Sequence, residues 1–187
     1  MKKGLGFLLA VVAVIVVVVA LFGSSYNNLV ELEERVDKEA SNVSVMLERR
    51  ADLIPNLVNT VKGYVKHEEG VIKAITEARE NLLNASTIEE KSKANNELTN
   101  AINALMVIVE NYPDLKANEN FINLSDELAG TENRIANART TYNDAVSDYN
   151  STVKKFPSNL IANLFGFKEK DYFEVEESKK DVPKVEF

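Results

Sequence analysis

The chain has 187 residues, of which 45% are hydrophobic and 27% charged, a composition that favours folding over disorder. Its 29 acidic residues against 22 basic ones give a formal net charge of -7. This acidic balance argues against nucleic acid as a partner, because phosphate binding needs a basic surface. There is no cysteine and a single histidine, which excludes disulfides, thiol catalysis and cysteine-ligated zinc. We therefore expect no metal site and no cofactor.

The N-terminus carries the strongest signal. Met1-Lys2-Lys3 is followed by an apolar run from Leu5 to Phe22, and no charge returns until Glu31. With the small residues around it, this run is long enough to cross a ~30 Å hydrocarbon layer as a helix. A cleaved signal peptide is the alternative, but its apolar core is typically only ~7–15 residues, so we favour a retained anchor. The lysines before the run favour a cytoplasmic N-terminus, with the rest of the chain outside.

After the apolar run, hydrophobic residues recur at alternating steps of three and four, which predicts an amphipathic helix. The stripe passes through Pro55 without a change of phase: Leu29, Leu32, Val36, Ala40, Val43, Leu47, Ala51, Ile54, Val58, Val61 and Val65. Proline removes one backbone hydrogen bond and crowds the preceding turn. The unbroken phase predicts that Pro55 bends one long helix. The alternative is a new helix capped by Asp52.

Three further helices are expected. The second carries the stripe Val71, Ile75, Ala78 and Leu82, and Thr87 with Glu90 then forms a capping box at the start of the third. The third ends at Tyr112-Pro113, and the fourth runs from near Ala117 or Asn118 to Phe156-Pro157. No segment of these alternates like a strand. The sequence therefore predicts an all-α protein: a transmembrane helix, then an up-and-down antiparallel bundle of about four long helices.

These patterns divide the chain into three parts. We expect a cytoplasmic stub and transmembrane anchor over residues 1–25, a helical bundle over 26–157 and a short irregular C-terminal part over 158–187. The last part is predicted to begin with a short helix from Asn159 to Leu164 and to continue as an extended tail, because Phe173 and Val175 alternate with acids.

No catalytic set is evident. His67-Glu68-Glu69 resembles half of a zinc-protease signature but has no second histidine, so a polar turn is the better interpretation. Carboxylates spaced by three, such as Glu31 and Glu34, are typical of a solvated helix face. A metal-binding cluster of Asp114, Glu119 and Glu132 with Arg50 is the remaining enzymatic hypothesis.

Arg50 lies beside the apolar stripe, where its head can form an ion pair inside the bundle, with an acid near Asp114 or Glu132, or can dock a partner. The two most distinctive segments of the sequence are Tyr112–Asn120 and Phe156–Phe167. The residues proposed for partner docking are Arg49, Arg50, Pro55, Tyr112, Pro113, Asn118, Glu119, Phe156, Pro157, Phe165 and Phe167.

Several short motifs of the sequence resemble those of the LemA family. They include RRADLIPNLV from Arg49, YPDLKANENF from Tyr112, TENRIANAR from Thr131, YNDAVSDYN from Tyr142 and the ending VPKVEF. The resemblance implies a prokaryotic single-pass cell-membrane protein with a helical, coiled-coil-like bundle, and it supplies no catalytic residue. Ala40 and Ser44 depart from the family pattern, standing where its members often carry Trp and an acid.

The leading functional hypothesis is a non-enzymatic scaffold or adaptor, anchored in the bilayer through residues 5–22, that binds a protein partner at the membrane. The resemblance suggests a membrane protease of the HtpX type or a TPM-domain protein as that partner. A self-associating, homo-oligomeric protein that organises membranes is the alternative, and a metal-dependent enzyme is the third possibility.

Overall fold

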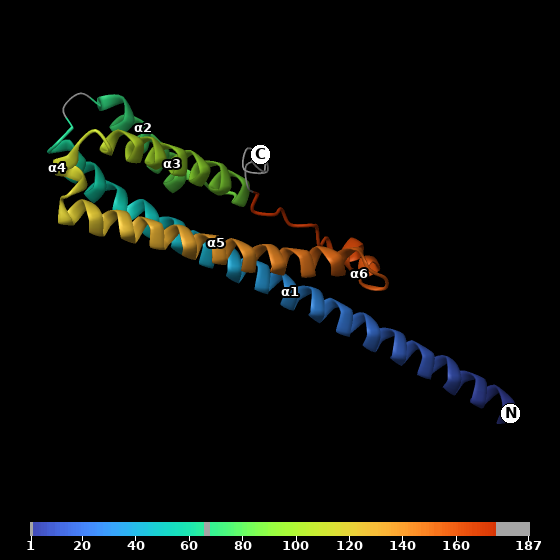
Figure 1. Cartoon of the computed structure of the whole chain (residues 1–187). Helices are drawn as coiled ribbons and strands as arrows, with labels where there is room; N and C mark the ends of the chain where they lie inside the picture. The colour runs from blue at the N-terminus through green and yellow to red at the C-terminus, as the bar shows by residue number, and fades with distance from the viewer. Residues whose placement is uncertain (1, 66–67, 175–187) are drawn as a thin grey trace, which may run out of the picture. The chain divides into compact units, whose positions relative to one another are not determined.

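The computed structural model describes residues 2–65 and 68–174. Over these residues it contains helices and no strand (Figure 1). The helices are α1 (Lys2–Lys62), α2 (Glu69–Asn84), α3 (Ile88–Val109), α4 (Pro113–Lys116), α5 (Glu119–Lys154) and α6 (Ser158–Phe165). The all-α prediction is confirmed, and the expected helix boundaries lie within a few residues of the observed ones. The short helix α4 was not anticipated. His67 and the ending VPKVEF lie outside the described residues.

The chain forms two compact units. The first, which we call the α6 unit, joins the part of α1 up to Lys38 with residues Asp144–Lys170. The second, the bundle unit, contains Glu39–Asn143 and residues 171–174. Helices α1 and α5 each contribute to both units.

The bundle unit is built from α2, α3 and the adjoining parts of α1 and α5. The hydrophobic stripes predicted from the sequence face its interior, as expected when amphipathic helices bury their apolar faces against one another. Each fully buried aliphatic side chain stabilises this core by about 1.5–3 kcal/mol relative to an exposed one. The buried side chains include Val43, Leu47, Ala51, Ile54, Leu57, Ile75, Leu82, Leu98, Ile102, Leu105, Phe121, Leu128 and Ile135.

Helix α1 continues through Pro55, so the alternative of a new helix capped by Asp52 is wrong. Proline has no N–H to donate to the carbonyl of Ala51, four residues earlier. Arg79 of α2 supplies the missing donor: its Nε–H donates to the Ala51 carbonyl at 2.9 Å. The tertiary contact satisfies the group that the proline leaves unpaired.

The expected capping box starts α3. The Thr87 hydroxyl accepts from the backbone N–H of Glu90 at 3.1 Å, and the Glu90 carboxylate accepts from the backbone N–H of Thr87 at 3.1 Å. It also accepts from the Ser86 N–H at 2.8 Å. These backbone hydrogen bonds hold the pKa of Glu90 below its ordinary value.

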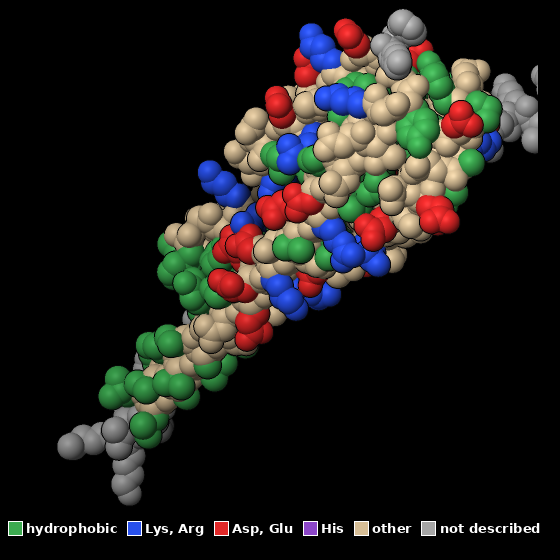
Figure 2. Space-filling model, turned by 90° about the vertical axis from the view of Figure 1, so that its left-hand side faces the viewer, with side chains coloured by type: hydrophobic (Ala, Val, Ile, Leu, Met, Phe, Trp, Pro, Cys, Tyr) green, Lys and Arg blue, Asp and Glu red, His purple; other side chains and the backbone are tan. Residues whose placement is uncertain are grey.

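The N-terminal part of α1 is uniformly apolar. Among the described residues, α1 is the one helix long and apolar enough to cross a membrane. The side chains that the structure describes in this part are mostly solvent-exposed, with Val14 and Val19 at 62% and 65%. In Figure 2, hydrophobic side chains cover this stretch and charged ones appear beyond it. A helix that is apolar all round and is not buried against any other described residue matches the pattern of a transmembrane segment.

Candidate functional site

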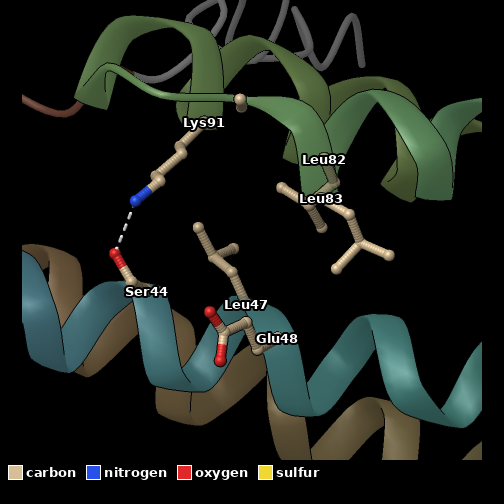
Figure 3. Close-up of a pocket in the computed structure, with 7 residues that line it drawn as sticks. Ser44, Leu47, Glu48, Leu82, Leu83 and Lys91 are labelled. Atoms are coloured by element: carbon tan, nitrogen blue, oxygen red, sulfur yellow. Dashed lines mark hydrogen bonds between the residues drawn. The ribbon is translucent and has the colours of Figure 1, made fainter.

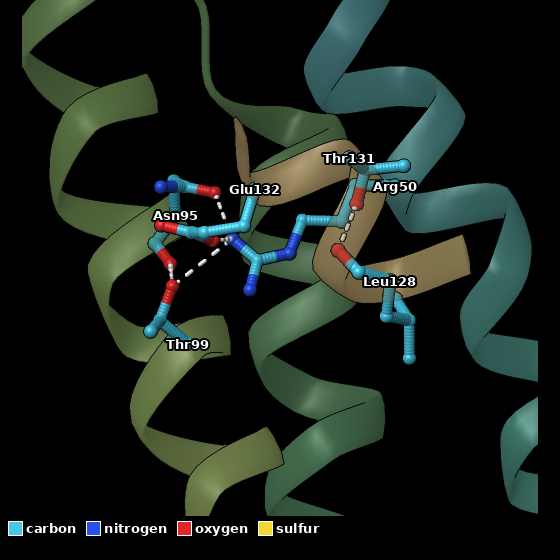
Figure 4. A network of polar contacts seen from close by, with 6 residues as sticks. All are labelled: Arg50, Asn95, Thr99, Leu128, Thr131 and Glu132. Carbon is cyan, nitrogen blue, oxygen red and sulfur yellow. Dashed lines mark hydrogen bonds and ion pairs between the residues drawn. The ribbon is translucent and has the colours of Figure 1, made fainter. Parts of the chain in front are cut away.

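Arg50 is buried in the bundle unit, with only 4% of its surface exposed. Its Nη1 lies 2.7 Å from a carboxylate oxygen of Glu132 on α5. The same nitrogen donates to Oδ1 of Asn95 at 2.8 Å and to the hydroxyl of Thr99 at 3.0 Å, both on α3 (Figure 4). Arg50 therefore ties α1 to α3 and α5, and the acid that it pairs with is Glu132.

The electrostatics of Arg50 reflect this burial. Desolvation lowers its pKa, and the attraction and hydrogen bond of Glu132 oppose that shift. Its Nε–H has no hydrogen-bond partner among the described residues. The guanidinium is held mainly through one nitrogen, and its burial places it inside the bundle rather than on a surface that a partner could reach.

A groove with polar walls runs along the surface of the bundle unit where α1 and α5 meet. We call it the α1–α5 groove. One hollow has a volume of about 400 Å³ and is lined by Asn56, Asn59, Thr60, Asn120, Asn123, Leu124 and Glu127. A second hollow of about 280 Å³ shares Glu127 and is lined also by Arg49, Leu53, Asp126, Gly130, Thr131 and Arg134. Amide side chains predominate in the first hollow, and charges of both signs in the second.

The amide-rich hollow has a clear chemical character. Each asparagine side chain offers both hydrogen-bond donors and an acceptor, which is the combination that a polypeptide backbone also presents. Arg49, one of the predicted docking residues, is exposed and lines the second hollow. Pro55 is exposed next to Asn56. Of the residues predicted for partner docking, Arg49 is the one that lines either hollow of the groove.

The residues predicted around Tyr112 surround α4. Tyr112 precedes that helix and Pro113 is its first residue. The side chain of Asn118 caps α5 by accepting from the Phe121 N–H at 3.1 Å, and its amide donates to the Tyr64 hydroxyl at 2.9 Å. Glu119 is exposed in the first turn of α5. These contacts show a local structural role for Asn118, which lies between α4 and α5 and caps the start of α5.

The remaining predicted residues belong to the α6 unit. Phe156, followed by Pro157 in a cis peptide bond, is 80% exposed. Phe165 is 59% exposed, and its ring packs edge-to-face on Tyr26 with centroids 4.9 Å apart. Phe167 packs on the same tyrosine at 5.7 Å. The structure thus brings three aromatic residues together beside α1.

A smaller pocket lies between α1 and the α2–α3 hairpin of the bundle unit (Figure 3). Lys91 donates to the Ser44 hydroxyl at 2.8 Å, and that hydroxyl donates to the Ala40 carbonyl at 2.9 Å. Leu47, Glu48, Leu82 and Leu83 complete its wall. Its volume of about 90 Å³ is too small for most organic ligands, which occupy pockets of about 300–1,000 Å³.

Sequence reasoning missed three polar residues with specific roles. Asn95 and Thr99 accept hydrogen bonds from Arg50, and Asn95 is buried, with 1% of its surface exposed. Its position in phase with Leu98, Ile102 and Leu105 was the available signal, because a polar residue within an apolar stripe must find a hydrogen-bond partner when buried. Arg79 gave no comparable signal.

The hypothesis of a metal cluster finds no counterpart in residues 2–65 and 68–174. Over that part of the chain, no three His, Asp or Glu side chains lie close enough together to hold a metal ion. Asp114 and Glu119 are exposed, whereas Glu132 is paired with Arg50.

The fold defines a class: an all-α protein with a helical bundle and one candidate N-terminal transmembrane helix. The particular family follows from comparison with known proteins. Residues 39–187 match the model of the LemA family, which is well over half of the chain. The chain belongs to the LemA family.

Characterised relatives are similar over most of the chain. Magnetosome protein MamQ 2 of Paramagnetospirillum magneticum is 29% identical, covering 89% of this chain and 71% of the relative. Magnetosome protein MamQ of Magnetospirillum gryphiswaldense is 28% identical, covering 79% of this chain and 64% of the relative. Protein LemA of Metamycoplasma hominis is 26% identical, covering 73% of this chain and 63% of the relative.

Proposed function

We propose that this protein is a non-enzymatic scaffold or adaptor, anchored in the cell membrane by residues 5–22, that binds a protein partner along the α1–α5 groove. The observation that carries the proposal is the groove itself. It is an exposed, amide-lined hollow of about 400 Å³ on helices whose opposite faces are fixed in the core. Rigid helices that present a polar surface with hydrogen-bonding groups suit the recognition of another protein.

The second hollow adds electrostatic selectivity. Arg49 and Arg134 lie there with Asp126 and Glu127. Alternating charges at the edge of an interface select a partner of complementary pattern more than they raise affinity. A membrane protease of the HtpX type or a TPM-domain protein is the partner to test first. The lysines before the apolar run support a cytoplasmic N-terminus and a bundle unit outside.

Names of the relatives support a non-catalytic role. Two are magnetosome proteins and one is a LemA protein, and none of these names states an enzymatic activity. The polar cluster of Arg50, Glu132, Asn95 and Thr99 is used to join helices and offers no nucleophile beside a base.

Site-specific photo-crosslinking in intact cells tests the docking surface. A photoreactive residue at Asn123, which lines the groove, should give one adduct of defined mass. The matched control is Asn100, an exposed asparagine on α3. Charge reversal at Arg134 should weaken the Asn123 adduct. Equal adducts from both asparagines would contradict docking in the groove.

Self-association is the second candidate, and the same experiment separates it. An adduct at Asn123 with twice the mass of the chain and no other protein would replace the adaptor proposal with a homo-oligomeric membrane organiser. The long amphipathic helix α1, which contributes to both units, is the observation that favours this candidate.

A further inference from the structure

Helix α6 has an apolar face that the other residues described by the structure do not cover. Leu160 is 48% exposed, Leu164 71% and Phe165 59%, and Phe156 in the preceding turn is 80% exposed. Single hydrophobic residues on a surface are ordinary, but four large ones within ten residues form an apolar patch of the kind that marks an interaction site.

The adjoining face of α6 is fixed on α1. Ile161 and Ala162 form a buried cluster with Leu29, and Val153 and Phe167 pack against that cluster. Gly166 ends the helix with a φ of 82°, the left-handed conformation that glycine adopts without strain. The N–H groups of Gly166 and Phe167 both donate to the Ala162 carbonyl, at 2.9 and 3.0 Å. This turn directs Phe167 back onto Tyr26, beside Phe165.

These contacts set the level of α6 along α1. The apolar run ends at Phe22, and a helix rises about 1.5 Å per residue, so Tyr26 lies about 6 Å and Leu29 about 10 Å beyond it. No charged side chain lies between Phe22 and Glu31. Interfacial helices bury their apolar face about 5–10 Å into the boundary between headgroups and acyl chains, and aromatic residues gather at that level. Helix α6 is therefore held where such a boundary would be.

We propose that the exposed face of α6, with Phe156, Leu160, Leu164 and Phe165, lies in the interface of the lipid bilayer as a second membrane contact. This inference rests on the proposed insertion of residues 5–22. The occupant is lipid because α6, which carries the patch, packs on α1 close to the end of the apolar run. Tyr26 of α1 connects the apolar run to the patch, because its ring contacts both Phe165 and Phe167.

The charges around the patch fit an anionic lipid surface. Residues 152–170 contain four lysines, in a chain whose net charge is -7. Lys154 pairs with Glu169, and Lys170 pairs with Glu33 and Asp37 of α1, so the lysines proposed to face the headgroups are Lys155 and Lys168. Lys155 and Lys168 are exposed. Lysines beside an apolar interfacial helix attract anionic headgroups while their stems cover apolar surface. The second contact would fix the orientation of the α6 unit on the membrane.

Tryptophan quenching by brominated lipid provides the test, since the chain contains no tryptophan and each variant therefore has a single one, which is excited selectively over the tyrosines at the red edge of the absorption band. The full-length variants Val14→Trp, Leu164→Trp and Val107→Trp are reconstituted in vesicles of phosphatidylcholine and phosphatidylglycerol with brominated acyl chains. Leu164 and Val107 are each 71% exposed, and Val107 lies on α3, which makes it the matched control. We expect strong quenching and a blue-shifted emission for Val14→Trp and Leu164→Trp, and little quenching for Val107→Trp.

The outcomes separate the inference from the anchor on which it rests. Quenching of Val14→Trp with no more quenching of Leu164→Trp than of Val107→Trp overturns the interfacial role and leaves the anchor intact. Absence of quenching at Val14→Trp overturns both. A blue shift of Leu164→Trp that depends on protein concentration, without bromine quenching, assigns the patch to a second copy and overturns the inference. Phe156→Trp repeats the measurement at a second exposed site.

Discussion

The Nε–H of Arg79 donates to the carbonyl of Ala51 at 2.9 Å, and that carbonyl is the one that Pro55 leaves without its helical donor. The proline and the arginine thus form a matched pair on neighbouring helices. Pro55 exposes an acceptor in the middle of α1, and α2 uses it to dock. The proline, which would be expected to disrupt α1, thus creates a hydrogen-bonded contact between α1 and α2.

This pairing predicts an energetic coupling. Arg79→Ala should lower the free energy of unfolding by about 1–2 kcal/mol, because a carbonyl in the half-buried helix contact loses its donor. In a Pro55→Ala background, residue 55 regains an N–H that pairs with Ala51, so the same arginine substitution should cost about 1 kcal/mol less. Urea unfolding of the four proteins in detergent, followed by helical circular dichroism, measures the coupling. Lys73→Ala on the exposed face of α2 is the control, and equal costs in both backgrounds would refute the pairing.

The Arg50 network predicts an asymmetric response to mutation. Arg50→Ala should destabilise the protein by about 2–4 kcal/mol, because it leaves buried Asn95 without a donor and removes packing from the core. Glu132→Gln removes the opposite charge from the buried Arg50 but keeps an amide oxygen that can accept from Nη1, so it should cost less than the arginine substitution, about 1–3 kcal/mol. Thermal and urea unfolding compare the two. Arg49→Ala, one residue away and exposed, should change stability by less than about 0.5 kcal/mol. A larger cost for the glutamate substitution would contradict this description.

Asn143 holds the backbone of the C-terminal segment of the bundle unit. Its amide donates to the Phe173 carbonyl at 3.1 Å and accepts from the Phe173 N–H at 2.9 Å, as a neighbouring strand would. Phe173 is 1% exposed, and the Arg139 guanidinium lies 4.7 Å from its ring centroid. Asn143→Ala should remove both hydrogen bonds and destabilise the unit by about 1–3 kcal/mol.

Hydrogen exchange gives the sharper test of that contact. The Phe173 amide should exchange much faster in Asn143→Ala, and Asn143→Asp should give an intermediate result, because a carboxylate accepts from the N–H but cannot donate to the carbonyl. Thr140→Ala, on an exposed turn of α5, should leave the Phe173 amide protected. Unchanged protection in Asn143→Ala would show that burial alone holds the segment.

The capping box predicts a pH dependence with a defined sign. The pKa of Glu90 is lowered by the Ser86 and Thr87 backbone N–H groups, so its contribution to stability is present above the pKa of an unfolded glutamate, about 4.3. The contribution disappears as the pH falls through the lowered pKa of the folded state. The wild type and Glu90→Gln should therefore differ near neutral pH and converge in acid. Unfolding curves across that range measure the gap, and a gap independent of pH would argue against the carboxylate contacts.

Much of the helical architecture could be predicted from local patterns. The apolar run indicated the N-terminal helix, the unbroken stripe indicated that α1 passes Pro55, and Thr87 with Glu90 marked the start of α3. Each of these signals lies within a few turns of one helix, where spacing of 3.6 residues per turn fixes which side chains share a face. The sequence also suggested that Arg50 forms an ion pair with an acid near Asp114 or Glu132, with partner docking as the alternative.

Tertiary packing decided which polar groups meet. It paired Arg50 with Glu132 rather than Asp114, placed Arg79 on the carbonyl left free by Pro55, and set Phe165 and Phe167 on Tyr26. It also placed Arg50 in the core and left Arg49 at the groove. Such contacts depend on the rotation and axial register of one helix against another. Periodicity along a single helix determines its buried face, but that register emerges only when the side chains of several helices pack together.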